Sequence, residues 1–320
     1  MDEQAELKAE YEKIKNSNFK QQNLLGFRVN LSDKTMMIIY FGLGAFLIVI
    51  GIISLQTSGG LNEIVYRYDE ECKKNYVPGS HSCRVELIIE NDMEKEVMIY
   101  YQLDGFYQNH RRYIKSRSAD QLYGKDITLE ELKNSQECDP YITNKEMGKY
   151  ISATGMKFKD DKINAVAVPC GLMAKSYFND TYKNWQVNDE IIFPNEKNIS
   201  LQEDRDFRFN NQNLEKQWID MEDEHFIVWM RPAGKSNFRK LWGRIEQDLK
   251  KGDKVSLVIV DNYDVSSFEG KKYLILSNVN SLGGKNVFIG ASYIFIGSII
   301  LIFGIVLYFG IKYHSKLQAI

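Results

Sequence analysis

Hydrophobic residues are concentrated in two uninterrupted runs, while elsewhere along the 320 residues apolar and polar positions alternate. The runs are "TMMIIYFGLGAFLIVIGIISL" at 35–55 and "VFIGASYIFIGSIILIFGIVLYFGI" at 287–311, and neither contains Asp, Glu, Lys, Arg or His. At 1.5 Å per residue, helices of these lengths would be about 31 and 37 Å long, enough to cross a hydrocarbon core of about 30 Å. The pattern predicts two transmembrane helices in preference to two buried core helices.

Between the runs, short stretches with apolar residues at every second position predict β-strands. In "RVELIIE" (84–90), Val85, Leu87 and Ile89 share one face. "EVMIYYQL" (96–103) follows after a short Asn-Asp turn, so the two segments are predicted to form an antiparallel hairpin. Further strands are expected at 225–230, 255–260 and 273–279.

Two helices are expected among these strands. The first begins at Thr128, whose capping-box partner is Glu131. The second follows Ser236 and ends at Gly252. Its apolar face would carry Phe238, Leu241, Trp242, Ile245 and Leu249. Strands joined by turns, with few helices, predict a mainly antiparallel β-sandwich ectodomain held by the two transmembrane helices.

The first run is longer than the hydrophobic region of a signal peptide and follows a polar segment, so it is expected to remain as a signal anchor. Two spans would place both termini on one side of the membrane, and lysines and arginines beside the spans favour the cytosol weakly. The polar N-terminal segment predicts a marginal, solvated helix. The expected organisation is a cytosolic tail at 1–34, spans at 35–55 and 287–311, an ectodomain at 56–286 and a cytosolic tail at 312–320.

All four cysteines, Cys72, Cys83, Cys138 and Cys170, lie between the two runs. An even number confined to one segment predicts two disulfides in an oxidising lumen or exterior. No C-x-x-C is present, which argues against a zinc site. Three pairings are possible, and we favour Cys72 with Cys83 and Cys138 with Cys170 because these close the shortest loops. In the chain-entropy treatment the two loops would stabilise by roughly 3 and 4 kcal/mol.

Two glycosylation sequons, "NDT" at Asn179 and "NIS" at Asn198, lie in the same segment. They are predicted to carry glycans if that segment is luminal. A third sequon, "NLS" at Asn30, precedes the first run on the presumed cytosolic side and is not expected to be used. Cysteines and sequons together predict a luminal or extracellular ectodomain.

Glycines recur every seven residues in both runs, at Gly44 and Gly51 and at Gly290, Gly297 and Gly304. Small residues on one face allow another helix backbone to approach closely, and such packing drives association in lipid. The alternative is that glycine is simply frequent in membrane helices. We expect this ridge to contact a partner helix, with lipid or the chain's own first span as the other possibilities.

Catalytic signatures are absent from the sequence. There is no G-x-S-x-G, no G-x-x-x-x-G-K-[ST] and no H-E-x-x-H, and the four histidines follow no common pattern. The lack of ionisable residues in either run argues against a transporter acting alone. We expect no enzyme activity, no cofactor and no metal. The alternative interpretation is a glycosylated, membrane-anchored ectoenzyme or receptor that acts without a partner.

Five segments, in order along the chain, resemble the cell-division-control-protein-50 (ligand-effect-modulator) family. They are "FKQQNL" (19–24), "FYQNHRRYIKSR" (106–117), "PCGLMAKSYFND" (169–180), "FIVWMRPAGKSNFRKLWGRIE" (226–246) and "GGKNVFIGASYIFIGS" (283–298). The sequence departs from the family pattern at "DEIIFPNEKNIS" (189–200), where a tryptophan is common. It departs again at Val287, where proline is common.

The resemblance implies a non-catalytic subunit of a type IV P-type ATPase. Such a subunit would bind the phospholipid-flipping ATPase in the endoplasmic reticulum, enable its export to the Golgi, endosome or plasma membrane, and support its transport cycle. The implied fold is a luminal β-sandwich with long insertions, two disulfides and two membrane helices.

The segment "FYQNHRRYIKSR" places five basic residues among aromatic ones, in a chain of formal net charge −2. The basic residues are His110, Arg111, Arg112, Lys115 and Arg117. Such interleaving would suit nucleic acid, but a luminal location excludes it. Internal ion pairs that stabilise the sandwich are favoured, followed by contacts to acidic loops of the ATPase and then by lipid headgroups. Arginine suits the first two because it binds carboxylates bidentately and stacks on aromatic rings.

Overall fold

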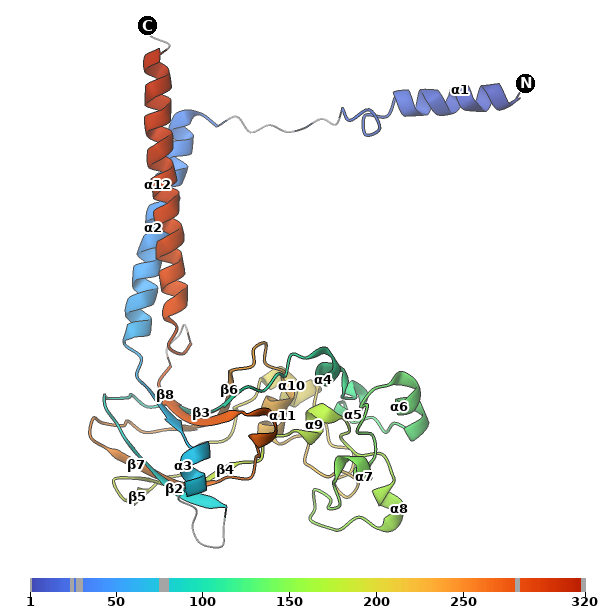
Figure 1. Cartoon of the computed structure of the whole chain (residues 1–320), viewed down its shortest axis with the longest axis vertical. Helices are drawn as coiled ribbons and strands as arrows, with labels where there is room; N and C mark the ends of the chain where they lie inside the picture. Colours follow the sequence, from blue (N-terminus) through green and yellow to red (C-terminus); the bar gives the residue numbers. More distant parts are fainter. Residues whose placement is uncertain (1, 24–25, 27–30, 75–80, 280–282, 318–320) are drawn as a thin grey trace. The chain divides into compact units, whose positions relative to one another are not determined.

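The two apolar runs form the two longest helices of the computed structural model, which describes residues 2–23, 26, 31–74, 81–279 and 283–317 (Figure 1). The chain divides into one unit of residues 1–55 and 288–320 and a second unit of residues 56–287. Asn30, whose sequon is not expected to carry a glycan, lies outside the described residues.

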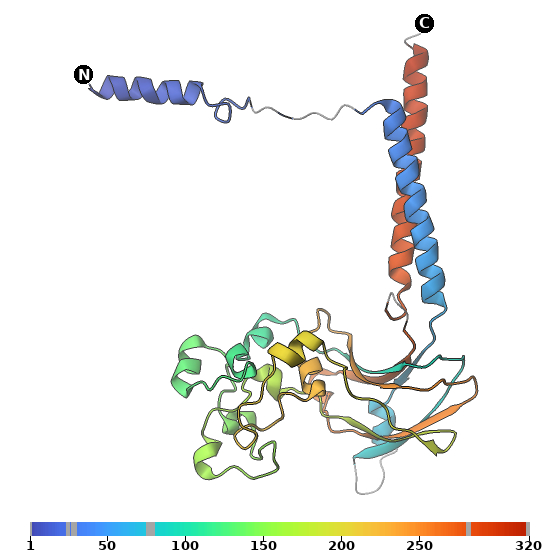
Figure 2. The ribbon, with the colours of Figure 1, turned by 180° about the vertical axis from the view of Figure 1, so that it is seen from behind.

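The first unit consists of helices. They are α1 (Asp2–Lys15), most of α2 (Asp33–Gly59) and most of α12 (Val287–Leu317). Both α2 and α12 are long and apolar enough to cross a membrane, which confirms the two predicted spans. Helices α2 and α12 run beside one another (Figures 1 and 2). The predicted N-terminal helix is present as α1, and its described side chains are exposed.

The second unit contains two four-stranded antiparallel sheets within its described residues. The first has the order β1-β8-β3-β6 and the second the order β2-β7-β4-β5. The strands are β1 (Glu63–Arg67), β2 (Ser82–Ile88), β3 (Val97–Asp104), β4 (Thr181–Val187), β5 (Glu190–Ile191), β6 (Phe238–Ile245), β7 (Lys254–Val260) and β8 (Lys271–Ser277). The predicted mainly antiparallel fold is confirmed.

The core lies between the sheets, because each strand buries alternate side chains. On β2 the buried residues are Cys83, Val85 and Leu87, which face buried residues of β7 across the ladder. On β3, alternate residues from Val97 to Leu103 are buried in the same hydrophobic cluster. Full burial of a large aliphatic side chain stabilises by roughly 1.5–3 kcal/mol, so the alternation fixes which face of each sheet turns inward.

The predicted hairpin of 84–90 with 96–103 is wrong. Strand β2 pairs with β7, whereas β3 pairs with β6 and β8, so the two segments belong to different sheets. The connection between them is held by the loop that joins β6 to β7, since the Ile89 N–H donates to the Asp253 carbonyl and Met93 bridges to Leu249. Residues 89–96 are long enough to cross the roughly 10 Å between packed sheets. Both strands can therefore bury their apolar faces from opposite sides of one core.

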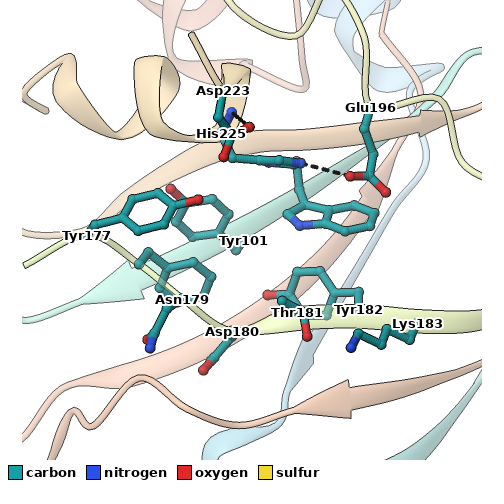
Figure 3. A pocket seen from close by; sticks show the side chains of 12 residues that line it. Tyr101, Tyr177, Asn179, Asp180, Thr181, Tyr182, Lys183, Glu196, Asp223 and His225 are labelled. Carbon is teal, nitrogen blue, oxygen red and sulfur yellow. Dashed lines mark hydrogen bonds and ion pairs between the residues drawn. The ribbon is translucent and has the colours of Figure 1, made fainter. Parts of the chain in front are cut away.

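The segment 225–230, predicted as a strand, is instead the helix α11 (Glu224–Met230). Phe226 and Trp229, like Ile227 and Met230, are three residues apart and buried, which is helical spacing. The helix begins at Asp223, whose side chain accepts a hydrogen bond from the His225 N–H (Figure 3). A short apolar run without polar interruption does not distinguish a buried strand from a buried helix.

The segment after Ser236, predicted as a helix, is instead strand β6. A bulge opposite Ile99 and Tyr100 leaves Trp242 as an extra residue between Leu241 and Gly243. The bulge shifts the phase of alternation, so the apolar residues Phe238, Leu241, Trp242 and Ile245 have helical spacing although they lie on a strand. The predictions for these two neighbouring segments are therefore exchanged. The first is a helix where a strand is predicted, and the second is a strand where a helix is predicted.

Short helices occupy the insertions between strands, and most gather at one end of the sheets (Figures 1 and 2). They are α3 (Asp69–Lys74), α4 (Arg111–Lys115), α5 (Ala119–Leu122), α6 (Leu129–Ser135), α7 (Asn144–Met147), α8 (Asp160–Ile163), α9 (Leu172–Lys175), α10 (Gln202–Phe207) and the 3-10 turn η1 (Ser266–Phe268). The predicted capping box is present at the start of α6, where Thr128 and Glu131 exchange hydrogen bonds. A second box, formed by Thr143 and Glu146, starts α7.

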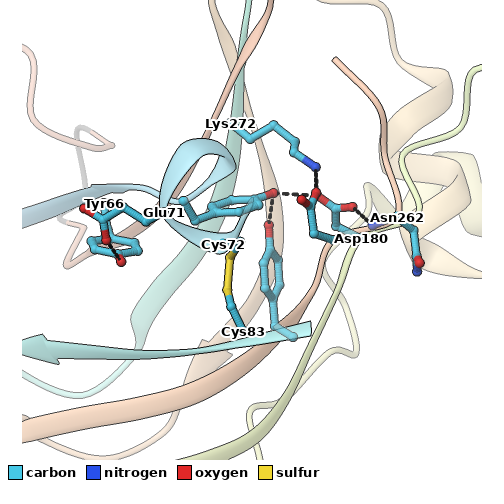
Figure 4. Close-up of a disulfide and its surroundings, with 10 residues drawn as sticks. Tyr66, Glu71, Cys72, Cys83, Asp180, Asn262 and Lys272 are labelled. Atoms are coloured by element: carbon cyan, nitrogen blue, oxygen red, sulfur yellow. Dashed lines mark hydrogen bonds and ion pairs between the residues drawn. A yellow bond between two sulfur atoms is a disulfide. The ribbon is translucent and has the colours of Figure 1, made fainter. Parts of the chain in front are cut away.

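Two disulfides join Cys72 to Cys83 and Cys138 to Cys170, which is the sequential pairing. All four cysteines are buried and none is free. The first disulfide ties α3 to β2 (Figure 4), and the second closes the loop that carries α7 and α8.

A buried lysine connects the two sheets (Figure 4). Lys272 on β8 is only 1% exposed, and its Nζ donates to Asp180 Oδ2 at 2.7 Å. Asp180 directly precedes β4 of the other sheet. The same ammonium also donates to Asp261 and, at 2.6 Å, to the Tyr263 carbonyl.

Asp180 is satisfied from several directions. The Tyr68 hydroxyl donates to Oδ2 at 2.8 Å, while the backbone N–H groups of Asn262 and Tyr263 donate to Oδ1 at 2.6 Å. Burial raises the pKa of Asp180, and the Lys272 ammonium together with these hydrogen bonds opposes that shift. The carboxylate therefore depends on its partners to remain charged inside the protein.

Replacing Lys272 by Met is expected to destabilise the second unit by roughly 3–5 kcal/mol, because the Asp180 carboxylate would stay buried without its cation. Lys271→Met is the matched control, since Lys271 is exposed on the same strand. Denaturant unfolding of the detergent-purified chain, followed by tryptophan fluorescence, measures the loss, since all four tryptophans lie in this unit. Equal losses for the two variants would contradict the structural role of the pair.

Candidate interaction surfaces

Two of the three aromatic residues of segment 106–117, Phe106 and Tyr113, anchor it in the core, whereas Tyr107 is exposed. The Phe106 ring lies 5.6 Å from that of Tyr113 and 5.7 Å from that of Trp229, centroid to centroid. Tyr113 is buried, and its hydroxyl is 2.8 Å from that of Ser176. Burial raises the pKa of Tyr113 to about 12, so the phenol stays neutral. These rings therefore position the short helix α4 and are not available for stacking with a ligand.

The basic residues of the segment point the other way. His110, Arg111, Arg112 and Lys115 are all exposed. Within the described residues, none of the four lies within 4.0 Å of a carboxylate as an ion pair. The favoured interpretation, internal ion pairs, is not what the described structure contains, because the anchoring of Tyr113 turns the polar face of α4 to solvent. We call these four residues the α4 basic cluster.

Arg117, the fifth basic residue, lies apart from this cluster. It is half-buried, with Nη1 3.5 Å from the Met230 carbonyl and 3.9 Å from Met173 Sδ. It lines a cavity of about 340 Å³ together with Arg208 and Arg231. We call this the arginine cavity, and its apolar lining is Leu122, Phe209, Met230 and Pro232.

One carboxylate, Asp204, organises two of the three arginines. It is nearly fully buried at the start of α10, and it accepts hydrogen bonds from Arg231 Nε and from Arg208 Nη1, the latter at 3.3 Å. The bond to Asp204 raises the pKa of Arg231. Arg208 was not predicted as a site residue, because only the packing of α10 beside α11 brings it to Arg231.

A second cavity, of about 370 Å³, opens beside β4 (Figure 3). His225 Nε2 lies 2.9 Å from Glu196 Oε2, and the His225 ring packs against Trp242 at 5.4 Å. Burial raises the pKa of Asp223, which caps α11. Three ionisable groups of this cavity, Glu196, Asp223 and His225, are thus engaged in contacts that hold α11 and the preceding loop.

The two sequons of the second unit are differently constrained. Asn179 is exposed at the rim of this second cavity, immediately before the buried Asp180. Asn198 is exposed too, but its backbone N–H and the Ser200 hydroxyl both donate to the Glu224 carboxylate, at 2.7 and 2.8 Å. Both asparagine side chains are therefore accessible to modification.

The glycines of the two long helices face each other. A Cβ added at Gly51 would lie 2.8 Å from the Gly290 carbonyl oxygen, and one added at Gly297 would lie 2.9 Å from that of Gly44. The converse additions at Gly290 and Gly44 would lie 2.9 and 3.1 Å from the facing oxygens. The ridge thus packs on the chain's own first span, in place of the expected partner helix.

Among the described residues, no group of three or more His, Cys, Asp or Glu side chains could hold a metal ion. Two helices long and apolar enough to cross a membrane, with a disulfide-bonded β-sandwich between them in the sequence, define a two-span membrane protein. The sequence pattern of the LEM3 (ligand-effect modulator 3) family / CDC50 family matches residues 3–316. The chain belongs to this family.

Curated relatives support the assignment along most of the chain. The protein is 36% identical over 310 residues to "ALA-interacting subunit 3" of Arabidopsis thaliana, covering 89% of this chain and 82% of the relative. It is 35% identical over 308 residues to "Putative ALA-interacting subunit 4" of the same plant, covering 88% and 85%. It is also 35% identical over 329 residues to "Cell cycle control protein 50A" of Mus musculus, covering 89% and 85%.

Gly297→Leu is expected to separate the two long helices, because the added side chain would collide with the facing backbone. Engineered cysteines at Tyr40 and Gly304 report the separation, since a Cβ on Gly304 would lie 3.2 Å from the Tyr40 Cβ, close to disulfide geometry. We expect mild oxidation to join this pair in the parent chain and to leave most thiols reactive with maleimide after Gly297→Leu.

Gly310→Leu on the same helix is the control, since a Cβ there would meet nothing within 4 Å. Equal cross-linking in the two leucine variants would show that the glycine ridge does not hold the helices together.

Proposed function

We propose that this chain is a non-catalytic subunit of a type IV P-type ATPase that moves phospholipid across a membrane. The observation that carries the proposal is similarity over 88–89% of the chain to proteins named ALA-interacting subunits. The sequence supports a non-catalytic role, since none of the catalytic signatures sought is present in it.

The subunit is proposed to act first as a chaperone and later as part of the transporter. It binds the ATPase in the endoplasmic reticulum and enables its export to the Golgi, endosome or plasma membrane. It then remains bound while the ATPase moves phospholipid across the membrane at the expense of ATP. The disulfides and the Lys272 network support this role, because they give the ectodomain a rigid surface on which a mobile partner can dock with a smaller entropic cost.

The proposed topology places residues 1–34 and 312–320 in the cytosol and residues 56–286 in the lumen or outside the cell. Two disulfides in that segment support an oxidising compartment. Exposed asparagines in two of its sequons support glycosylation there.

The α4 basic cluster is proposed as a contact for acidic loops of the ATPase. Four exposed basic residues without internal ion pairs in the described structure support this role, because complementary charge speeds and orients association. Lipid headgroups are the competing ligands, and the nucleic-acid interpretation is excluded by the proposed compartment.

Affinity purification of the chain in mild detergent is expected to recover a much larger P-type ATPase. Cells lacking the chain should retain that ATPase in the endoplasmic reticulum, without lipid-stimulated ATP hydrolysis. Mass spectrometry of the recovered complex and a hydrolysis assay measure the two effects. Recovery of the chain alone, with full ATPase turnover in its absence, would favour the ectoenzyme or receptor alternative.

The topology makes a separate prediction about glycans. Asn179→Gln and Asn198→Gln should each remove one glycan-sized mass from the chain isolated from a eukaryotic host, and the double variant should lose both. Asn30→Gln is the control and should change nothing, since Asn30 belongs to the proposed cytosolic tail. Intact mass spectrometry with and without glycosidase decides the matter. A glycan at Asn30 and none at the other two sites would invert the proposed topology.

A further inference from the structure

The arginine cavity carries more positive than negative charge. Its lining contains three arginines, Arg117, Arg208 and Arg231, and a single acidic residue, Asp204. Glu203 acts electrostatically on Arg231 but does not line the cavity. The balance among the lining residues is three positive charges against one negative charge, an excess of two. A concave site with such an excess attracts anions.

Arg117 is the one guanidinium lining this cavity that has no carboxylate partner among the described residues. Arg208 and Arg231 both bind Asp204, whereas Arg117 forms no ion pair within the described part of the chain. Its hydrogen bonds are a long one to the Met230 carbonyl and a weak one to the Met173 sulfur. A guanidinium has five N–H donors. Most donors of this half-buried side chain are therefore available to a ligand in the cavity.

We propose that the arginine cavity binds carboxylate side chains of an acidic peptide segment, and that this segment belongs to a loop of the partner ATPase. The identity of the partner rests on the proposed function above. The ligand class rests on the cavity itself. Arg117 would receive one carboxylate, and the Arg208 and Arg231 guanidiniums, oriented by Asp204, would receive a second.

Size and lining favour a peptide over a lone phosphate. At about 30 Å³ per water molecule, a cavity of about 340 Å³ holds on the order of ten waters, more than one phosphate group would displace. The apolar lining of Leu122, Phe209, Met230 and Pro232 suits the aliphatic stems of glutamate side chains. Two of the three guanidiniums already bind a carboxylate here, since Arg208 and Arg231 both donate hydrogen bonds to Asp204.

The neighbouring surface extends the same preference. The α4 basic cluster ends at Lys115, two residues before Arg117 in the sequence, and its side chains are exposed. An acidic segment seated in the cavity would therefore meet further basic residues where it leaves. Several charges in succession on one side suit a run of acidic residues better than a single small anion.

Binding of the peptide Ac-EEEE-NH2 to the detergent-purified full chain tests the cavity without the ATPase. We expect the wild-type chain to bind it, measured by calorimetry at constant ionic strength, and not to bind Ac-QQQQ-NH2. Arg117→Gln and Arg208→Gln should each weaken binding by about tenfold or more, equivalent to ~1.4 kcal/mol. Arg84→Gln is the matched control, since Arg84 is exposed on β2 and forms no ion pair within the described residues.

Three results would overturn the ligand class. Equal peptide binding by Arg84→Gln, Arg117→Gln and Arg208→Gln would place the binding elsewhere. Tighter binding of inorganic phosphate than of the peptide would make the cavity a phosphate site. Binding only to vesicles that contain phosphatidylserine would assign the arginines to a lipid surface. Unfolding curves like that of the wild type are required of each variant, and Arg208, with a side chain 54% exposed, supplies a variant less prone to misfold.

The same variants, co-expressed with the ATPase, test the partner. We expect Arg117→Gln and Arg208→Gln to recover less ATPase than Arg84→Gln does, although each folds. Wild-type recovery by both variants would overturn the assignment of the cavity to the ATPase and leave the subunit function intact. Failure of the wild-type chain to recover any ATPase would instead refute the proposed function.

Discussion

The buried ammonium of Lys272 is the constraint around which the unit of residues 56–287 is arranged. It comes from β8 of one sheet and meets Asp180 at the start of β4 of the other, while Tyr68, near the first disulfide, donates to the same carboxylate. Taking two charges out of water costs several kcal/mol per ion, so the pair contributes little net stability compared with apolar packing. Its contribution is selective, because any other alignment of these segments would leave a charge buried and unpaired.

Local patterns in the sequence predicted part of the fold, whereas contacts between distant segments, such as the Lys272 pair, could not be predicted. Alternating apolar residues identified the strands at 84–90, 96–103 and 255–260, and a short continuous apolar run identified the strand at 273–279. The pairing of β2 with β7 could not be predicted, because it depends on contacts between segments far apart in the chain. The two segments at 224–245 have other causes. The short apolar run of α11 fits a buried helix and a buried strand equally, and a bulge at Trp242 gives the apolar residues of β6 a helical spacing.

The interaction surfaces divide in the same way. Cysteine positions, glycine spacing and the basic residues of α4 are visible in the sequence. Exposure of Arg111 and Arg112 is not, because it follows from the burial of Phe106 and Tyr113 beneath them. The arginine cavity could not be predicted either, since Arg208 reaches it only after α10 has packed beside α11 and Asp204 has been buried between two guanidiniums.

Within the membrane-spanning unit, the glycine contacts restrict how another protein can approach. Gly290, Gly297 and Gly304 of α12 are already packed against α2, so the close backbone approach they allow is not available to a partner. Large exposed side chains also repeat every seven residues along α12, on the face about 200° around the helix from the glycines. They are Phe288, Phe295, Ile302 and Phe309. In the proposed complex, this face of α12 therefore meets lipid or ATPase helices through bulky side chains. These side chains keep the α12 backbone away from a neighbouring helix. Recognition on this face would then depend on how the aromatic rings fit into grooves of the neighbouring helix.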